Sequence, residues 1–348
     1  MSNVTPVKVF ATRGSDVLAK EICAALQNRL SAEFQPNRRL KLSKSAVVRF
    51  SNENLQVQVE NVRNHFAVVV HTQVPPINER LIELFALLDA IKGAQPADIL
   101  VVFPYYPYAR SDKKNQPRIS TMGYRLAHIL THSFGIGRVL LLDPHDDHIK
   151  HYFDPVADEI SSIYLFVDYL ERNVFASRPK ERSALVFPDE GASKRYSGVA
   201  RLLRIPTAYI DKSRHNNREE PEAKGIVGEV RNKFCLMIDD EILTGKTAIE
   251  DAKKILTEGA QEVWMLAPHA VFADKRMAKS RLIKKLEDSS IQKFIVTNSI
   301  PLDSRLIAGM EKFTVLSIAS LLAEAIKRAV VGESLTELYQ LDKVSLYR

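Results

Sequence analysis

Short apolar runs rich in β-branched and aromatic residues alternate along the chain with longer amphipathic stretches. The runs typical of strands are Val7–Ala11, Phe66–Thr72, Ile99–Tyr105, Val139–Asp143, Ala184–Pro188, Thr207–Ile210, Phe234–Ile238, Val263–Ala267 and Lys293–Thr297. The stretches typical of helices are Ser15–Arg29, Pro76–Lys92, Thr121–Ser133, Lys194–Leu203, Thr247–Glu258 and Val315–Val331. This alternation predicts the α/β class, with a mostly parallel sheet flanked by helices.

The alternation occurs twice, which predicts two similar α/β halves with a seam near Asp158–Ser162. A chain of 348 residues exceeds the length at which single cores stop growing, and its 45% hydrophobic content is ample for two cores. The segment Lys212–Gly228 is rich in charge, Asn, Pro and Gly, so it predicts a long mobile loop.

The formal net charge of +7 suits small anionic substrates. The 49 basic residues of the chain are scattered among 42 acidic residues without interleaved aromatics, so we expect no nucleic-acid partner. Cys23 and Cys235 lie in or beside apolar segments, which favours reduced, buried thiols. The first residues lack a secretion-signal pattern, and no apolar run reaches membrane-spanning length. These features predict a soluble cytoplasmic protein that does not contact membranes.

The segment Phe234–Thr247 combines a buried strand, two carboxylates and a turn that leads into a helix. Asp239 and Asp240 can accept hydrogen bonds from two vicinal sugar hydroxyls. The free backbone N–H groups of the following turn, Thr244–Thr247, can hold a phosphate. The segment therefore suits a phosphorylated ribose.

This segment has two other interpretations. Gly245-Lys246-Thr247 spells the end of a Walker A loop, but Asp240 stands where that loop needs a second Gly. A carboxylate there would repel the phosphates, so we reject this reading. An ordinary strand-to-helix turn, with acids favouring the helix amino end, remains the structural alternative.

Acidic or histidine residues follow several predicted strands. They are Asp143, His145, Asp189, Asp211, Asp239, Asp240 and His269. Ligands of open α/β sheets bind beyond the carboxyl ends of the strands, so we expect these side chains to converge on clefts.

The segment Phe103–Lys114 follows a strand and combines aromatic and cationic side chains. Arg110, Lys113 and Lys114 can neutralise a polyphosphate, and an aromatic ring can stack on a base. A solvated basic loop beside an aromatic turn explains the pattern equally well.

The segment Leu140–Phe153 crowds three His and three Asp into nine positions from Asp143 to His151. Zinc is one interpretation. A magnesium–phosphate site fits better, because no Cys joins the cluster and carboxylates supply the oxygen ligands that Mg²⁺ prefers. His145 would contact a phosphate, and Asp189 would hold Mg²⁺ or orient a sugar hydroxyl.

Two pairs of cations follow. Lys212 and Arg214 stand at the root of the predicted loop, where cations can neutralise charge that develops in a phosphoryl-type transition state. Lys194 and Arg195 read as charges on a helix face.

In their order and spacing these motifs resemble the ribose-phosphate diphosphokinases, also called phosphoribosyl pyrophosphate synthetases. The resemblance runs from VKVFATRGSDVLAKEI through PYYPYARSDKK, DPHDDHIKHYF, FPDEGASKR, IDKSR and DDEILTGKT to LLAEAIKRAVVGESLTELY. It implies two tandem phosphoribosyltransferase-like domains, an ATP-side domain at 1–158 and a ribose 5-phosphate-side domain at 159–312. The helix and tail at 313–348 would pack back on the first domain.

The resemblance also implies an activity and its residues. ATP and ribose 5-phosphate would give phosphoribosyl pyrophosphate and AMP with Mg²⁺, in a homo-oligomer that is a dimer or hexamer. Catalysis falls to Lys212, Arg214 and His145, and the metal to His145 and Asp189. The implied ATP-binding residues are Phe50, Asn52, Asn54, Arg110, Asp112, Lys114 and His145. The implied ribose 5-phosphate-binding residues are Asp239, Asp240, Thr244, Gly245, Lys246 and Thr247.

Four departures indicate a divergent member of that family, one of them being Glu190-Gly191-Ala192 in place of a Gly-rich turn. Phe50-Ser51-Asn52-Glu53-Asn54 stands where the family usually has Phe-Ser-Asp-Gly-Glu, Ser213 replaces an Arg, and Leu243 replaces an Asp. Two alternatives stay open. One is a non-catalytic subunit that binds and regulates a true synthetase, and the other is a phosphoribosyltransferase.

Overall fold

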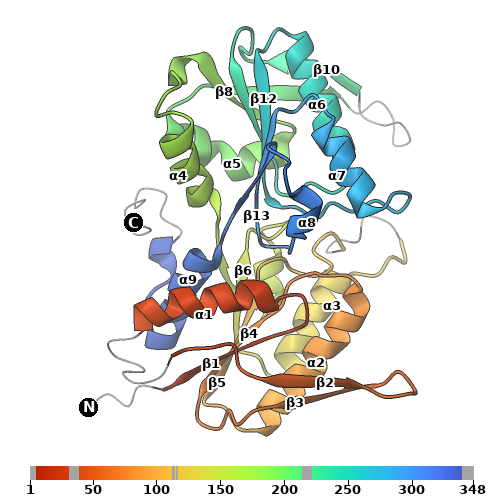
Figure 1. Cartoon of the computed structure of the whole chain (residues 1–348), viewed down its shortest axis with the longest axis vertical. Coiled ribbons are helices and arrows are strands. Elements are labelled where there is room, and N and C mark those ends of the chain that lie inside the picture. The colour runs from red at the N-terminus through yellow and green to blue at the C-terminus, as the bar shows by residue number, and fades with distance from the viewer. Residues whose placement is uncertain (1–4, 31–38, 112–113, 115–116, 214–221, 339–348) are drawn as a thin grey trace.

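The computed structural model describes residues 5–30, 39–111, 114, 117–213 and 222–338 of the chain. Two sheets, each covered by helices on both faces, lie one above the other along the long axis of the molecule (Figure 1). The predicted α/β class is therefore confirmed. We refer to each sheet with its helices as a domain.

The first domain is built on a parallel sheet of five strands in the order β1-β4-β5-β6-β7. Its strands are β1 (Val7–Ala11), β4 (Phe66–Val70), β5 (Asp98–Phe103), β6 (Arg138–Leu142) and β7 (Asp158–Ile160). Its helical segments are α1 (Asp16–Leu30), α2 (Ile77–Gly93), α3 (Met122–His128), the π-helical turn η1 (Ile129–Ser133) and the 3₁₀ turn η2 (Ile149–Tyr152).

Alternate residues of each central strand face opposite sides of this sheet. Val68 and Val70 of β4 pack in the cluster that contains α1, whereas Ala67 and Val69 pack in the cluster that contains α2 and α3. A strand that is covered on both sides must be apolar at every position. This explains why β4 reads FAVVV rather than alternating with polar residues.

The second domain is built on a sheet of seven strands in the order β10-β9-β8-β11-β12-β13-β14, in which only the β10–β9 pair is antiparallel. The strands are β8 (Ser183–Phe187), β9 (Thr207–Ser213), β10 (Glu222–Val227), β11 (Phe234–Ile238), β12 (Glu262–His269), β13 (Lys293–Thr297) and β14 (Phe313–Leu316). The helical segments are α4 (Ile163–Asn173), η3 (Lys180–Arg182), α5 (Glu190–Leu203), α6 (Lys246–Thr257), α7 (Lys279–Glu287) and α8 (Ser304–Ile307). Helices α4 and α5 cover one face, and α6 and α7 cover the other.

The last long helix of the described chain, α9 (Ala319–Val331), returns from the second sheet to the first domain (Figure 1). Leu322 and Ile326 share a core cluster with Leu18 and Ile22 of α1, and the 3₁₀ turn η4 (Thr336–Leu338) adds Leu338 to it. The first domain is therefore built from both ends of the described chain.

Two sequence predictions are wrong in detail, and one pair of strands is not predicted. The helix predicted from Val315 begins only at Ala319, because Phe313–Leu316 forms the edge strand β14. The loop predicted at Lys212–Gly228 contains the strand β10, whose charges and Gly are typical of an edge strand; residues 214–221 of it lie outside the described residues. The hairpin of β2 (Ser45–Arg49) and β3 (Leu55–Val59) is not predicted, because its half-exposed strands lack a continuous apolar run.

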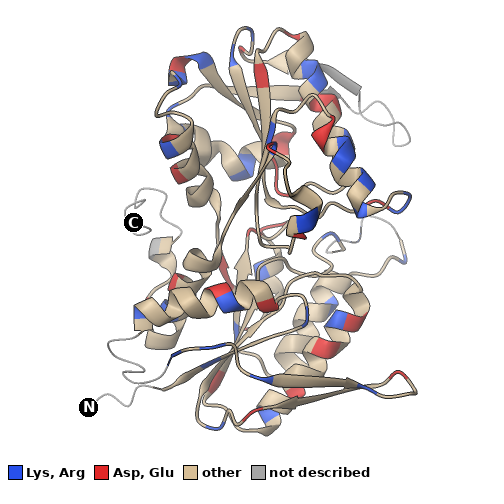
Figure 2. Ribbon diagram, in the orientation of Figure 1, with Lys and Arg blue, Asp and Glu red and all other residues tan. Residues whose placement is uncertain are grey.

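The structure also bears on the expectations for the charges, for membrane-spanning segments and for the cysteines. Lys and Arg are interspersed with Asp and Glu over both domains rather than gathered in one region (Figure 2). Within the described ranges, none of the helices is both long and apolar enough to cross a bilayer. Cys23 and Cys235 are free and buried, as predicted, and burial raises the pKa of each thiol to about 12.

Hydrogen bonds join the two domains around His269, which ends β12 and is fully buried. Its Nε2 donates to the carbonyl oxygen of Asp143 in the first domain at 2.9 Å, and its Nδ1 bonds the hydroxyl of Ser299 at 2.9 Å. The hydroxyl of Thr72 donates to the Ser299 carbonyl at 2.6 Å. Because buried polar groups keep their partners, these bonds fix how the domains meet.

Glu83 on α2 is a buried carboxylate whose loss should destabilise the first domain. It is 1% exposed and accepts hydrogen bonds from the backbone N–H and Nε of Arg13, both at 2.7 Å, and from Arg80 at 2.9 Å. We expect Glu83→Ala to lower the free energy of unfolding by about 3 kcal/mol, because it leaves the largely buried Arg80 guanidinium without its counter-charge and the backbone N–H of Arg13 without its acceptor. Urea unfolding followed by circular dichroism measures this.

Glu79 gives the matched control, because it lies one turn earlier on α2. Its contact with Arg13 is 3.7 Å long, and the carboxylate is 31% exposed. We expect Glu79→Ala to cost less than about 1 kcal/mol. Equal losses in the two variants would contradict a special role for the buried carboxylate.

Candidate active site between the two domains

The paired acids of the predicted sugar motif lie at the carboxyl end of β11, the central strand of the second sheet. The Asp239 carboxylate accepts a hydrogen bond from the backbone N–H of Asp240 at 2.9 Å. Burial, followed by the adjacent charge of Asp240, raises the pKa of Asp239 well above its ordinary value. Asp240 is therefore the ionised member of the pair.

His145 approaches this pair from the first domain, where it follows β6. Its Nδ1–H donates to Oδ2 of Asp240 at 2.5 Å. This hydrogen bond to Asp240 raises the pKa of His145 despite its burial. Burial alone would raise the pKa of Asp240, but the bond to His145 and the charges of His145 and Arg195 outweigh it and lower that pKa to about 2. The two residues thus form an ion pair across the domain boundary.

The turn that presents His145 is held by Asp143. Asp143 is buried, has a left-handed backbone with φ 39°, and accepts hydrogen bonds from Ser161 and Ser162 at 2.5 to 2.9 Å. Its side chain is thus turned away from the site, and its carbonyl is taken by His269. The prediction that Asp143 and His269 reach a cleft is wrong, since both support the turn from behind.

Arg195 of α5 points into the site rather than outward, which corrects its reading as a charge on a helix face. One Nη donates to the carbonyl of His145 at 2.6 Å, and the guanidinium lies 3.8 Å from Asp240 and 3.5 Å from Asp147. Only 20% of its side chain is exposed. Lys194 is 75% exposed and pairs with Glu190, so for that residue the prediction is confirmed.

Asp189 caps the amino end of α5. Its Oδ1 accepts the backbone N–H of Ala192 at 2.8 Å, so the helix starts at Glu190 and not near Lys194 as predicted. The backbone of Asp189 is extended, with φ −159° and ψ 179°. These angles do not belong to a helix, but they are typical of an N-cap residue. The cap fixes the carboxylate beside Asp239 and Asp240 at the cavity wall.

The turn Thr244–Thr247 leads into the amino end of α6. Gly245 is its N-cap with a left-handed φ of 66°, and a Cβ built there would lie 2.3 Å from Cδ2 of Leu286. The hydroxyl of Thr244 accepts the backbone N–H of Lys246 at 3.3 Å. The amino end of a helix favours anions, because its dipole is positive there and its first N–H groups have no acceptor within the helix.

Two adjoining cavities meet at the acidic pair. The smaller, of about 410 Å³, is lined by Arg110, Glu241 and the loop through Ala248. The larger, of about 700 Å³, extends over Asp146, Asp147, Lys194 and Arg195. Both are lined by His145, Asp189, Asp239 and Asp240. The convergence predicted from the strand ends thus holds for these four residues.

The donors at this junction suit a divalent cation. His145, Asp240 and Glu241 each offer a ligand atom, and these atoms lie within 4.8 Å of one another. Asp189 and Asp239 line the same cavities. A set made mostly of carboxylate oxygens fits Mg²⁺ better than zinc, because Mg²⁺ prefers oxygen ligands.

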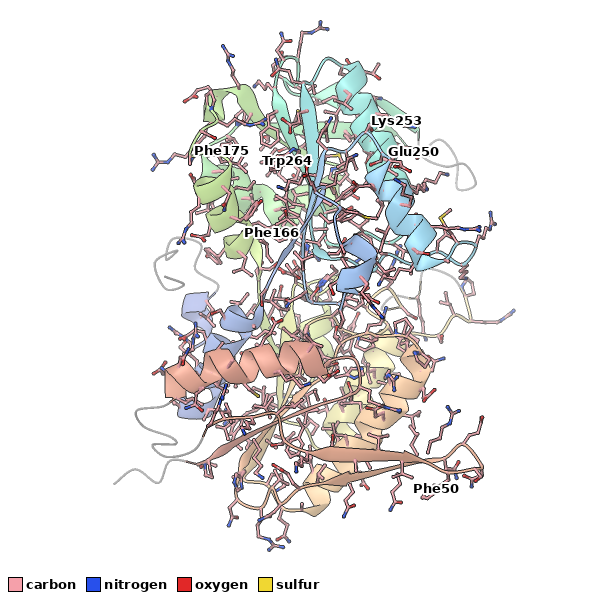
Figure 3. The ribbon with its side chains drawn as sticks, viewed as in Figure 1. Phe50, Phe166, Phe175, Glu250, Lys253 and Trp264 are labelled. Atoms are coloured by element: carbon pink, nitrogen blue, oxygen red, sulfur yellow. The ribbon has the colours of Figure 1, made fainter. Side chains whose placement is uncertain are left out.

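Other predicted residues lie elsewhere. Phe50, Asn52 and Asn54 lie in the turn of the β2–β3 hairpin, and none of them lines either cavity. Phe50 is 47% exposed at the end of this hairpin (Figure 3). Asp211 and Lys114 also line neither cavity. Asp112 and Arg214 lie outside the described residues. Lys212 lies in β9, but its side chain is not described.

Glu241 and Tyr105 are site residues that the sequence reasoning missed. Glu241 is 6% exposed and accepts hydrogen bonds from the Tyr105 hydroxyl at 2.7 Å and from Arg110 at 3.0 Å. The only sequence signal for Glu241 is that a third acid follows Asp239 and Asp240. Its partners stand more than a hundred positions earlier, so no local pattern could indicate the contact.

Two family models match the chain. The N-terminal domain of ribose phosphate pyrophosphokinase matches residues 7–135. The phosphoribosyl synthetase-associated domain matches residues 186–340. The first match ends before His145, and the second contains the acidic pair and the loop after it.

Curated relatives match over nearly the full length. The ribose-phosphate pyrophosphokinase of Fusobacterium nucleatum is 33% identical, with 97% of this chain and 100% of the relative covered. That of Aquifex aeolicus is 31% identical, with 96% and 99% covered. The crystal structure of phosphoribosylpyrophosphate synthetase from Mycobacterium smegmatis is similar with a TM-score of 0.81 and 28% identity, covering 94% of this chain and 100% of that one.

Proposed function

The chain belongs to the ribose-phosphate pyrophosphokinase family, and from that premise we propose how its own residues perform the reaction of the family. The reaction transfers the diphosphoryl group of ATP to the C1 hydroxyl of ribose 5-phosphate and gives phosphoribosyl pyrophosphate and AMP. The assignment of residues rests on one observation. The acids Asp239 and Asp240 and the amide-rich turn Thr244–Thr247 line the same cavity of about 410 Å³.

That cavity takes ribose 5-phosphate. Asp240 and Asp239 accept hydrogen bonds from the two vicinal ring hydroxyls, while the N–H groups at the start of α6 bind the 5-phosphate. Thr244, Lys246 and Thr247 add side-chain donors around it. Contacts at both ends of the sugar hold its C1 hydroxyl in one orientation, which lowers the entropic cost of the transfer.

ATP lies across the first-domain wall of the site. Arg110, Asp112 and Lys114 bind it there, and His145 contacts its phosphates through Nε2, since Nδ1 is taken by Asp240. Phe50, Asn52 and Asn54 lie on the projecting hairpin, from which they would reach the adenine bound to a second copy of the chain. The protein is therefore proposed to be a homo-oligomer, a dimer or hexamer, in the cytoplasm, without nucleic-acid partners.

In the reaction, the C1 oxygen attacks the β-phosphorus in line as its proton is lost to solvent. The bond between the β-phosphorus and the bridging oxygen to the α-phosphate breaks, and AMP leaves with that oxygen. Lys212 and Arg214 neutralise the charge that builds on the transferred group. Asp189, and His145 in its neutral form, would hold Mg²⁺, which would supply positive charge to neutralise the phosphates.

The turn over the 5-phosphate gives the first test of this assignment. We expect Gly245→Ala to raise KM for ribose 5-phosphate about tenfold, because an added Cβ at φ 66° meets Leu286 and shifts the N–H groups. Gly309→Ala is the matched control, since Gly309 has φ 76° with open space around its Cβ position. Both variants should lose about 1 kcal/mol of stability to backbone strain. A rise in KM for Gly309→Ala as well would show that strain alone is responsible.

AMP formation tests the function itself. Purified protein with ATP, Mg²⁺ and ribose 5-phosphate should produce AMP and phosphoribosyl pyrophosphate in equal amounts, and omission of the sugar phosphate should stop both. AMP at the same rate without the sugar phosphate would indicate hydrolysis, and no AMP at all would contradict the activity.

The non-catalytic alternative finds support in the second matched model, which is described as a synthetase-associated domain. It predicts that ribose 5-phosphate binds in calorimetry while no AMP is formed. Absence of both binding and turnover would contradict the site and not only the catalytic role.

A further inference from the structure

Glu241 is a buried charge between the two halves of the site, beside His145 and Asp240. It follows Asp240 directly and is attached to the second domain through its backbone, which pairs with His269. Its side-chain partners, Tyr105 and Arg110, both belong to the first domain. Burying a carboxylate costs free energy, which the hydrogen bonds from Tyr105 and Arg110 must offset.

Both carboxylate oxygens of Glu241 are in use. Oε2 accepts the Tyr105 hydroxyl at 2.7 Å, and Oε1 accepts one Nη of Arg110 at 3.0 Å. Tyr105 is itself only 4% exposed, and its ring meets that of His269 edge to face at 4.7 Å. The carboxylate therefore stands on a rigid, buried base.

Arg110 is the opposite kind of residue. Its side chain is 56% exposed, although it lines the smaller cavity. A long exposed side chain occupies many rotamers unless something fixes it, and ordering it on ligand binding costs entropy. Glu241 engages one of the five guanidinium N–H groups, and the planar geometry of the group then orients the others.

We propose that Glu241 is a positioning residue for ATP, which holds the Arg110 guanidinium against the second domain so that its remaining N–H groups face the triphosphate. The proposal rests on the proposed function, because it needs Arg110 to contact ATP. It also gives the ATP side and the ribose side a common support. Asp240 and Glu241 are adjacent in sequence. The residue that binds the sugar is therefore directly followed by the residue that holds Arg110 in place for ATP.

The charge of Glu241 could instead repel ATP, and the two effects have opposite signs. Arg110 offsets the carboxylate at 3.0 Å, and the Glu241 side chain, although it lines the smaller cavity, is only 6% exposed. Repulsion of the triphosphate is therefore weak compared with the gain from a fixed guanidinium. The direction in which KM for ATP changes when the charge of Glu241 is removed therefore decides between positioning and repulsion.

The decisive variant is Glu241→Gln, which keeps the shape and an acceptor for Tyr105 but removes the charge. KM for ATP should rise about tenfold, the effect of losing one charge-assisted hydrogen bond, while kcat and KM for ribose 5-phosphate change less than about threefold. An unchanged or lower KM for ATP, or an equal rise in both KM values, would overturn the proposal. If the wild type makes no AMP, the proposed function fails first, which is a separate result.

A double-mutant cycle distinguishes positioning from a general structural effect. In an Arg110→Gln background, Glu241→Gln should raise KM for ATP by less than about twofold, because the residue to be positioned is already gone. Multiplicative effects of the two changes would contradict action through Arg110. Retained thermal unfolding midpoints establish that both variants fold.

Glu262→Gln is the matched control. Glu262 also pairs with an arginine, Arg178, at 2.7 Å, but it begins β12, whereas His269 ends that strand near the site. Its kinetic constants should equal those of the wild type within about twofold, the scatter expected for a distant surface pair. A tenfold rise in KM for ATP in this variant would mean that any lost ion pair has the effect, and the proposal would fail.

Discussion

Replacing Asp240 with Asn is expected to lower kcat/KM for ribose 5-phosphate at least ~1,000-fold, because the substrate hydroxyl loses its charged hydrogen-bond acceptor. The residue is the ionised member of the acidic pair, with a pKa of about 2. The change also leaves His145 and Arg195 without their shared counter-charge. Initial rates of AMP formation against sugar phosphate concentration measure the loss.

Asp239 provides an internal comparison, because the two acids are neighbours with different charge states. Burial and the charge of Asp240 raise the pKa of Asp239, so its carboxyl group already resembles the neutral amide of Asn. We expect Asp239→Asn to lower kcat/KM less, by about tenfold. An equal or larger loss at Asp239 would contradict the assignment of the charge. Asp288→Asn, at an exposed surface pair with Lys284, should leave the rates unchanged.

Replacing Lys212 with Ala is expected to lower kcat at least ~100-fold, which is the scale of losing one preorganised group that stabilises transition-state charge. Residue 212 lies in β9 just beyond its parallel pairing with β8, and Asp189 follows the end of β8. The backbone thus brings residue 212 to the edge of the sheet where the acids gather. Because the charge matters mainly in the transition state, both KM values should change little.

Lys253→Ala on the exposed face of α6 is the control for a lost lysine. Lys212→Arg should recover part of the rate, since it restores the charge on a different geometry. If Lys212→Ala stays within a few-fold of the wild-type kcat, the function assigned to this segment is wrong.

The buried strands were the most predictable part of the fold, and there is a physical reason for this. A strand such as β11, which reads FCLMI, is covered on both faces and must be apolar throughout. The apolar run that indicates this strand is therefore visible within its own five residues. The hairpin strand β2, which reads SAVVR, is half-exposed and shows no such run. The sequence predicts a helix at the end of the edge strand β14, because a long apolar stretch follows it.

The candidate site was predictable where one segment carries the whole signal. Asp239, Asp240 and the turn after them follow one strand, and general sheet geometry brings other strand ends beside them. Arg195 and Glu241 were not found, because their contacts join residues 50 and 131 positions apart in sequence. A single sequence shows that such residues are charged but not which way they face.

The return of α9 to α1 affects the order in which the chain can fold during synthesis. The ribosome releases α1 early, with Leu18, Ile22 and Leu26 ready to pack, but supplies α9 only after the whole second domain has emerged. Domains generally fold as units when their last element becomes available. We therefore expect the second domain to acquire its native structure first, while the amino-terminal one waits for its final helix.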